Sequence, residues 1–546
     1  MKRKVMMAFA VMMAVALAAC GGSKKDESRT APSAETEAAA DENEDKGEED
    51  SNEETPRETV KLSMFVDEPW WPYSDWSGTM PRWATEQTGV DFDVTVAADT
   101  TELDLMVASG TLPDVIISSD FNLLSDESVC YDWGSLIDEY GMDPVHPAYQ
   151  FVNTANDGKF YTIMVGWSAD YEYEQYPSVN PEGVCATARE DIYNAACEAL
   201  GITEIATLED LEAAMEICKE KYPDVTPYIF GSEWGQDRYM SALYGCAWEG
   251  FADRDGKAIL WISQDRRKDL MMKMNEWYRK GYILEENFSW SNVNTQYEWC
   301  YSGNCFIAAA LSNAASNMDT GSADAGADFK WVPLTDIHTD NNEICATATG
   351  WRGYFISRNC KDPEAAMRMA EFLINKETGY TMLWGVEGED WSWNEDKTIA
   401  TFNYSQADPN YTELNAERQF KWGWLGHDGI SNNMAYTAAP KTRQSLEWVG
   451  SITTRNPALG LVMNAMQSDS EEYVIYQNLK ELDKNYMVKI ICAGSEEEAA
   501  AQYDEMTENA KKLGVEKVED WANSIYGEKI AAYNEVKGIG PEGWEK

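Results

Sequence analysis

Acidic side chains are the residues of this chain most able to do chemistry, because Asp and Glu occupy 95 of its 546 positions. Glu387 and Asp390, inside the segment 385–391, are the clearest candidates for a paired general acid and base. Such pairs arise by chance in so acidic a sequence, so a surface or turn position is the favoured interpretation. The chain contains no HExxH zinc motif, no Walker A phosphate loop and no GxSxG nucleophile elbow. We therefore expect a protein that is not an enzyme.

Metal-binding chemistry is equally unsupported by the residue types. The chain has three His, at 146, 338 and 427, and its 11 Cys include no CxxC pair. Cys300 and Cys305 are near enough in sequence to form a disulfide, which an exported chain permits. Cys197, Cys218 and Cys492 lie on apolar faces of predicted helices, which indicates free buried thiols. No metal ion and no cofactor are expected.

Net charge and aromatic content narrow the class of ligand. The formal net charge is −51, so the chain would repel the phosphates of nucleic acids, and no nucleic-acid partner is expected. Hydrophobic residues make up 44% of the chain, enough for folded cores. The chain also has 22 Trp. A core alone usually holds fewer, because each ring is large and carries a polar N–H.

The N-terminus has the pattern of an export signal. Three basic residues at positions 2–4 precede an unbroken apolar run at 5–19, which is too short to span a membrane as a helix. The run ends in Leu-Ala-Ala-Cys20-Gly, which resembles a bacterial lipobox. We expect residues 1–19 to be a signal peptide and Cys20 to carry the lipid anchor, on the extracellular face of the cell membrane. An ordinary secretory signal with a chance Cys is the alternative.

An acidic segment separates this signal from the folded part. Residues 21–60 contain 14 Asp or Glu, five Lys or Arg and no aromatic residue. Such a composition cannot bury enough apolar surface to become ordered, and like charges extend it. We expect residues 20–57 to form a lipidated, disordered linker.

The remaining residues alternate between strand and helix patterns. Apolar residues alternate at 60–66 and 90–96, and 115–117 is a short buried strand, with helical stretches near 80–88 and 101–109 between them. Further helices begin at the caps Thr207, Asp362 and Ser495. Strand and helix in alternation predict an α/β fold with a largely parallel sheet.

Several motifs along the chain then resemble the extracellular solute-binding lipoproteins of ABC importers, in particular the family 1 type that takes oligosaccharides. The lipobox and linker lead into VKLSMFV at 60–66. The other similar segments are MVASGTLPDVI at 106–116, DGKFY at 157–161, YSGNCFIAA at 301–309, NCKDPEAA at 359–366 and GVEGEDW at 385–391. Each motif is weak alone, and their order along the chain carries the resemblance. At 305–306, Cys-Phe departs from the small residues usual in the family.

The resemblance implies a two-lobed α/β fold of the periplasmic-binding-protein type (type II), with a hinge and an interlobe cleft. Residues 58–165 with 350–450 would form lobe 1, and 166–349 with 451–546 would form lobe 2. It also implies ABC permease subunits as membrane partners. Ligand contacts are then expected at the carboxyl ends of strands and at the hinge, where ligands sit in open α/β sheets.

An acidic, Trp-rich cleft suits a neutral oligosaccharide, whose C–H faces stack on rings while its hydroxyls bind carboxylates, amides and Arg. The candidate ligand-binding residues lie at strand ends, in loops and at crossings between lobes; they are Trp70, Trp71, Ser118, Ser119, Asp120, Trp167, Trp234, Asp237, Asn313, Trp351 and Arg352. For each Trp, packing in a core or between lobes is the competing interpretation. A surface-anchored glycoside hydrolase and a transport lipoprotein for peptides or lipid precursors remain the alternatives.

Overall fold

The computed structural model describes residues 58–99, 101–176, 183–231, 237–290, 293–395, 397, 399–404, 411–426, 429–430 and 439–542. The predictions for the signal peptide, Cys20 and the acidic linker, and those for Trp234 and His427, lie outside these residues. Within them, no helix is long and apolar enough to cross a membrane.

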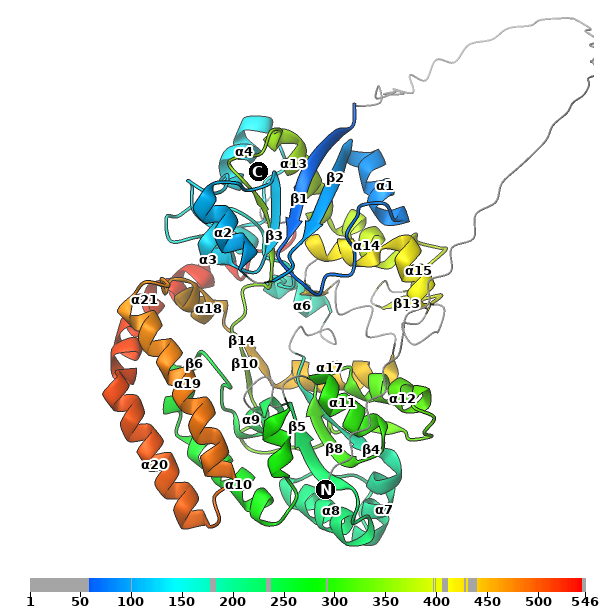
Figure 1. Ribbon diagram of the computed structural model, residues 1–546, viewed down its shortest axis with the longest axis vertical. Coiled ribbons are helices and arrows are strands. Elements are labelled where there is room, and N and C mark those ends of the chain that lie inside the picture. The colour runs from blue at the N-terminus through cyan, green and yellow to red at the C-terminus, as the bar shows by residue number, and fades with distance from the viewer. Residues whose placement is uncertain are drawn as a thin grey trace, which may run out of the picture. The chain divides into compact units, whose positions relative to one another are not determined.

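The first sheet has the strand order β11-β3-β1-β2 (Figure 1). Its strands are β1 (Val60–Val66), β2 (Val90–Val96), β3 (Val115–Ser118) and β11 (Gly353–Ile356). β1 runs parallel to both β2 and β3, and β11 is antiparallel to β3. The strands predicted at 60–66, 90–96 and 115–117 are therefore confirmed, as are the helices between them, α1 (Thr79–Thr88) and α2 (Glu102–Ser109).

Alternate residues of β1 enter two different cores, which is why both faces of this sheet are covered. Leu62 and Met64 join a cluster with residues of α1 and of α13 (Pro363–Ile374). Phe65 joins a second cluster on the opposite face, with Leu103 of α2 and Phe121 of α3 (Phe121–Leu124). The same face as α1 also carries α4 (Trp133–Tyr140), which packs on α13.

The second sheet has the order β5-β8-β4-β9. Its strands are β4 (Cys185–Arg189), β5 (Thr226–Phe230), β8 (Cys305–Ala310) and β9 (Trp331–Pro333). β5 and β8 are parallel, and β4 is antiparallel to β8 and β9. The sheet contributes to a large core that also includes residues of the helices α7 (Glu190–Leu200), α8 (Leu208–Lys221), α9 (Arg238–Tyr244) and α10 (Arg266–Arg279).

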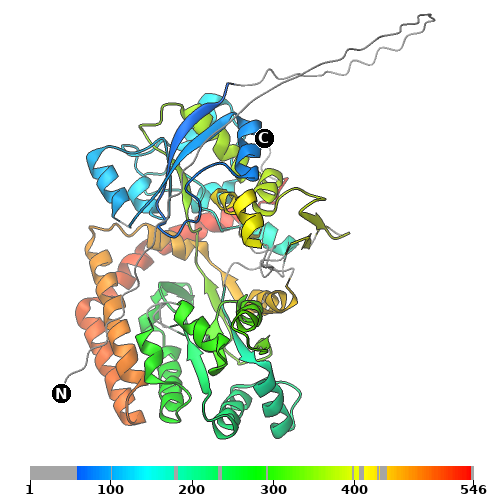
Figure 2. The same ribbon diagram turned by 45° about the vertical axis from the view of Figure 1, so that its right-hand side comes forward.

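Three long helices close this second core on one side, as both views show (Figure 1, Figure 2). They are α19 (Glu471–Ile491), α20 (Glu496–Leu513) and α21 (Val515–Val536). The predicted start of α20 is confirmed, because the Ser495 side chain accepts a hydrogen bond from the Glu498 backbone N–H. The helix ends at Gly514, which adopts the left-handed conformation at φ 106°.

Segments far apart in sequence link the two sheets. β10 (Ile344–Ala346) pairs in parallel with β14 (Thr453–Arg455), and Val165 exchanges backbone hydrogen bonds with the 351–352 segment. The lobe division proposed from the sequence stays a prediction. However, α17 (Pro440–Ile452) places Trp448 and Val449 in the second core, so we propose that lobe 2 resumes near residue 440 instead of 451.

Ten Cys lie among the described residues, and those other than Cys345 are free thiols. Cys300 and Cys305 are both buried, with their sulfurs 3.0 Å apart. Cys197 and Cys218 are buried as expected, whereas Cys492 is only partly buried.

Candidate functional site

The first sheet brings the ends of three strands to one edge. β1 and β3 end there, and β11 begins there, because Gly353 pairs with Ser118 in the antiparallel register. The loop after β1 carries Trp70, and Trp351 immediately precedes β11. Two aromatic residues that are far apart in sequence are therefore placed side by side at this edge.

Five Trp gather at this edge, and we refer to them as the tryptophan cluster: Trp70, Trp71, Trp351, Trp422 and Trp424. Trp70 and Trp351 are stacked, with ring centroids 6.0 Å apart and planes within 5°. Trp70 is 49% exposed and Trp351 is 43% exposed, so both rings present surface to solvent. Trp424 contacts both of these rings, at 6.3 and 6.0 Å between centroids.

Trp71 and Trp422 form the buried base of the tryptophan cluster. Their ring centroids are 5.3 Å apart, and both residues belong to the core of the first sheet. Trp71 is only 5% exposed. This burial favours the competing interpretation, packing beneath the exposed rings, and ligand contact by Trp71 stays a prediction. The chain turns here, and the Trp71 backbone N–H donates to the Glu68 carbonyl at 2.8 Å. As a result the Trp70 side chain faces solvent, whereas the Trp71 side chain faces the core.

Arg352 lies under the exposed rings. Its guanidinium carbon is 3.5 Å from the centroid of Trp351, 5.1 Å from that of Trp70 and 5.0 Å from that of Trp71. The side chain is fully buried, and burial lowers its pKa to about 10, opposed by the charge of Glu68. At neutral pH the guanidinium is therefore still protonated.

Two further charged residues flank Arg352. Glu68 accepts a 2.7 Å hydrogen bond from the Trp70 indole nitrogen, and its other oxygen lies 3.6 Å from Arg352 Nη2. Lys421 places its ammonium 4.8 Å from the Trp424 ring centroid and 5.8 Å from that of Trp70. Burial, together with the charge of Arg352, lowers the pKa of Lys421.

Ser118, Ser119 and Asp120 lie at the same sheet edge, at the end of β3. The Ser118 hydroxyl is buried, donates to Asp67 Oδ2 at 2.9 Å and accepts from the Asp120 backbone N–H. Ser119 and Asp120 are exposed, and the Asp120 carboxylate caps α3. Burial raises the pKa of Asp67 to about 6, opposed by the Ser118 hydrogen bond and assisted by the charges of Glu68 and Asp120.

Trp167 and Asp237 take up structural partners instead. The Trp167 ring is buried and packs edge-on against Tyr149, with centroids 5.1 Å apart. Asp237 is buried, caps α9 and accepts a 2.5 Å hydrogen bond from the Tyr228 hydroxyl. Burial raises the pKa of Asp237 to about 6. Both of its oxygens accept hydrogen bonds, which favours a structural role for Asp237, and its contact with ligand stays a prediction.

Asn313 remains a candidate. It precedes α12 (Ala314–Asp324), and its buried Oδ1 has no hydrogen-bond partner among the described residues. Its role in binding stays a prediction.

Sequence reasoning missed Glu68, Lys421 and Trp424. Lys421 and Trp424 lie in the 3-10 helix η4 (Phe420–Leu425), whose sequence is FKWGWL. Two Trp and a Lys within six residues is a local signal that could have singled out this segment. Its proximity to Trp70 depends on the fold, because nothing between residues 70 and 420 predicts that contact.

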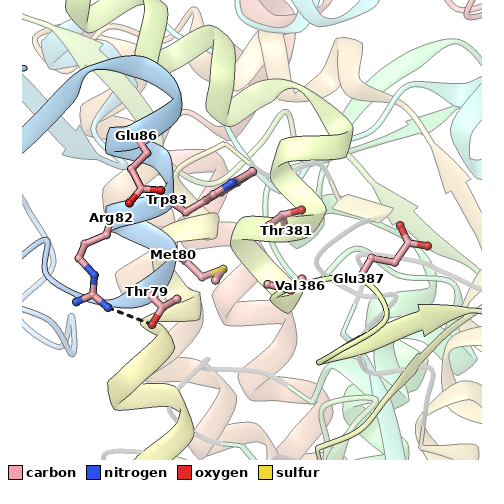
Figure 3. Close-up of a pocket in the computed structure, with 8 residues that line it drawn as sticks. All are labelled: Thr79, Met80, Arg82, Trp83, Glu86, Thr381, Val386 and Glu387. Atoms are coloured by element: carbon pink, nitrogen blue, oxygen red, sulfur yellow. Dashed lines mark hydrogen bonds between the residues drawn. The ribbon is translucent and has the colours of Figure 1, made fainter. Parts of the chain in front are cut away.

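The candidate acid–base pair has no arrangement suited to catalysis. Asp390 is buried, accepts from the Val386 backbone N–H at 2.9 Å and binds Arg418 at 3.2 Å, so it holds a turn together. Glu387 is exposed and lines a surface pocket of about 400 Å³ between α1 and the end of α14 (Lys376–Trp384). In that pocket, the Glu387 side chain lies on the far side of Thr381 from Glu86 (Figure 3). The structural interpretation of this pair is therefore favoured.

We compared the chain with known proteins by sequence and by structure. No family model matches the chain. A relative described as "Carbohydrate ABC transporter substrate-binding protein", from Streptococcus pneumoniae serotype 4 (strain ATCC BAA-334 / TIGR4), is 20% identical over 442 residues, which cover 75% of this chain and 82% of the relative.

Two solved structures extend the comparison. The alginate-binding protein AlgQ2 matches with a TM-score of 0.62 and 16% identity, covering 86% of this chain and 98% of that one. The substrate-binding protein FusA of the S. pneumoniae ABC transporter, solved in complex with kestose, matches with a TM-score of 0.60 and 16% identity, covering 86% and 100%. The predicted two-lobed α/β fold of solute-binding proteins is confirmed.

Proposed function

We propose that this chain is the substrate-binding protein of an ABC importer and that it captures an oligosaccharide on the tryptophan cluster. The observation that carries the proposal is the stacked pair of Trp70 and Trp351, half exposed at the edge of the first sheet where ligands of open α/β folds sit. The names of the relative and of the two solved structures support a carbohydrate ligand and a transport role.

The chemistry of the tryptophan cluster suits a sugar. Flat indole faces bury the C–H face of a pyranose ring, while the Arg and carboxylate beside them can bind hydroxyls directionally. Trp71 packs against Trp70 and Trp424 from the core side, with ring centroids 5.8 and 6.3 Å apart, and so supports the outer rings. The role is binding and not catalysis. A peptide or lipid precursor as ligand would be an outcome against the proposal.

A thermal-shift screen against oligosaccharides tests this function. A ligand that binds only the folded state raises the melting temperature in proportion to the logarithm of its concentration over Kd. We expect at least one oligosaccharide to stabilise the wild-type protein and to lose that effect in Trp70→Ala. Stabilisation by peptides alone, or release of cleaved sugars on prolonged incubation, would contradict the proposal.

We further propose that Cys20 is the lipid anchor and that it holds the protein at the extracellular face of the cell membrane, next to the ABC permease subunits. The lipobox-like sequence before Cys20 supports this. Cys20→Ala should move the protein from the membrane fraction to the soluble fraction without changing its melting temperature. Retention of this variant in the membrane fraction would contradict the assignment.

A further inference from the structure

Two cations lie at the tryptophan cluster, although the chain carries a formal charge of −51. Arg352 lies against Trp351, and Lys421 lies near Trp424. Burial and the like charge of Arg352 both lower the pKa of Lys421. Carboxylates are also present at this edge of the sheet, but among the described residues Glu68 is the one within ion-pair distance of Arg352.

The Arg352 guanidinium is buried without the hydrogen bonds that buried guanidinium groups require. None of its three nitrogens has a hydrogen-bond partner among the described residues. The Glu68 oxygen at 3.6 Å from Nη2 is near enough for an ion pair but too far for a hydrogen bond. Leaving a buried charged donor unsatisfied is costly, so such a group calls for an explanation.

Arg267 is a buried Arg with a structural role, and its guanidinium makes hydrogen bonds. Its side chain is equally buried, and Nη2 donates to both oxygens of Asp483, at 2.6 and 2.8 Å. That arrangement is a closed ion pair within a core. Arg352 has no such partner, and the rings that lie over it, Trp70 and Trp351, are half exposed. Because the Arg352 side chain is fully buried, a ligand reaches its guanidinium only if the rings over it move.

We propose that the oligosaccharide bound at the tryptophan cluster is acidic, and that a carboxylate, sulfate or phosphate group on it binds between Arg352 and Lys421. A planar guanidinium fork with open donors matches such groups, and the partly exposed ammonium of Lys421 adds a second charge. This inference rests on the proposed function and replaces the expectation of a neutral sugar, which relied on the charge of the whole chain.

A glycan array carrying acidic and neutral oligosaccharides, followed by calorimetric titration, tests the proposal. We expect the glycans that bind to carry an anionic group, and their carboxyl-reduced or desulfated counterparts to bind at least about 10-fold more weakly, as loss of a charge-assisted hydrogen bond implies. The array also separates carboxylate from sulfate and phosphate. Binding of neutral glycans only, or equal affinity for an acidic glycan and its neutral counterpart, would overturn the proposal.

Lys421→Met is the variant that sharpens the test, because Lys421 is partly exposed and its removal leaves the buried Arg352 in place. Lys421→Met should lower the affinity for the acidic glycan about 10-fold and leave the affinity for a neutral glycan unchanged. Lys489→Met is the matched control, since Lys489 lies 4.4 Å from a ring centroid, that of Tyr486, on α19. Equal effects of the two variants would contradict the inference. Failure of the proposed function looks different, since no oligosaccharide would then bind or Trp70→Ala would have no effect.

Discussion

The protein has two Trp-rich regions built on the first sheet and its helices, and they differ in what the rings do. In the tryptophan cluster, Trp70 and Trp351 are half exposed and lie over a cation. In the second region, Trp384 and Trp391 are at most 2% exposed and meet edge to face, with centroids 4.8 Å apart. We refer to Trp384, Trp391 and Trp393 with Tyr380 as the hairpin cluster, because it surrounds the β12 (Trp391–Trp393) and β13 (Ala400–Phe402) hairpin.

The hydrogen bonds of the two clusters differ in the same way. The Trp391 indole donates to the Gly385 backbone carbonyl at 2.9 Å, which fixes the turn before the hairpin. The Trp70 indole donates instead to the carboxylate of Glu68, which is also paired with Arg352. Abundance of Trp in a sequence therefore does not by itself indicate a binding site; half-exposed rings over a guanidinium without hydrogen bonds to the described residues are a stronger indication.

The largest expected effect is in the hairpin cluster. Trp384→Ala removes a fully buried ring that stacks on Tyr380, with centroids 4.4 Å apart. It should lower the free energy of unfolding by about 3–5 kcal/mol, the usual cost of emptying a buried aromatic site. Chemical denaturation measures this loss. Weaker glycan binding by the folded variant, without a change in stability, would break the distinction between the clusters.

The tryptophan cluster should respond in the opposite way. Trp70→Ala should weaken oligosaccharide binding about 5- to 150-fold, because a stacked ring contributes about 1–3 kcal/mol. Its effect on the melting temperature should be small, since the ring is 49% exposed. Calorimetric titration and a thermal melt on the same sample measure both.

Trp83→Ala is the matched control for Trp70→Ala. Trp83 is partly exposed on α1 and packs on Phe372, with centroids 5.1 Å apart, outside the tryptophan cluster. Trp83→Ala should leave the affinity for the oligosaccharide unchanged. If Trp70→Ala collapses the melting temperature while affinity in the folded fraction persists, the ring is packing and the site assignment is wrong.

The smallest expected effect is the pH dependence of stability caused by Asp67, at the edge of the first sheet. The pKa of Asp67 lies at about 6, above its ordinary value of 3.8, so the folded state holds this proton more tightly than the unfolded chain does. The Asp67 carboxyl therefore favours folding at low pH, and that contribution is lost as the pH rises from about 4 to about 6. Asp67→Asn should gain stability relative to the wild type across this window.

Urea denaturation of both proteins at several pH values measures the difference. Asp120→Asn is the control, because Asp120 is exposed at the same edge of the sheet, in the loop after β3. A difference between Asp67→Asn and the wild type that stays constant from pH 4 to pH 6 would show that Asp67 does not titrate as its burial implies.

Features that depend only on neighbouring residues were predicted well from the sequence. The alternating apolar residues of β1 and the cap at Ser495 are both in place, because a strand face and a helix start depend on neighbouring residues. The sequence also placed Trp351 and Arg352 at a crossing segment. It could not reveal that Lys421 and Trp424 meet Trp70, because that contact depends on how distant segments pack.

The burial of two predicted site residues has one physical cause. Trp71 and Asp237 occupy positions next to strand ends or helix starts, where ligand contacts are common, and the sequence showed that position correctly. It did not show that Trp422 would cover Trp71 or that Tyr228 would donate to Asp237. Position along the chain predicts which residues can reach a site, and only packing decides which of them remain available.

The pairing of Gly353 with Ser118 has a consequence for the order in which the protein is made. The first sheet cannot add β11 until the ribosome has synthesised the whole second sheet, from β4 to β9. Closing so long a loop is slow, so we expect the N-terminal strands to complete their sheet late. Proteolysis of a chain truncated before residue 353 should show them to be protease-sensitive. Late completion of this sheet would suit the export that the signal-like residues 1–19 predict.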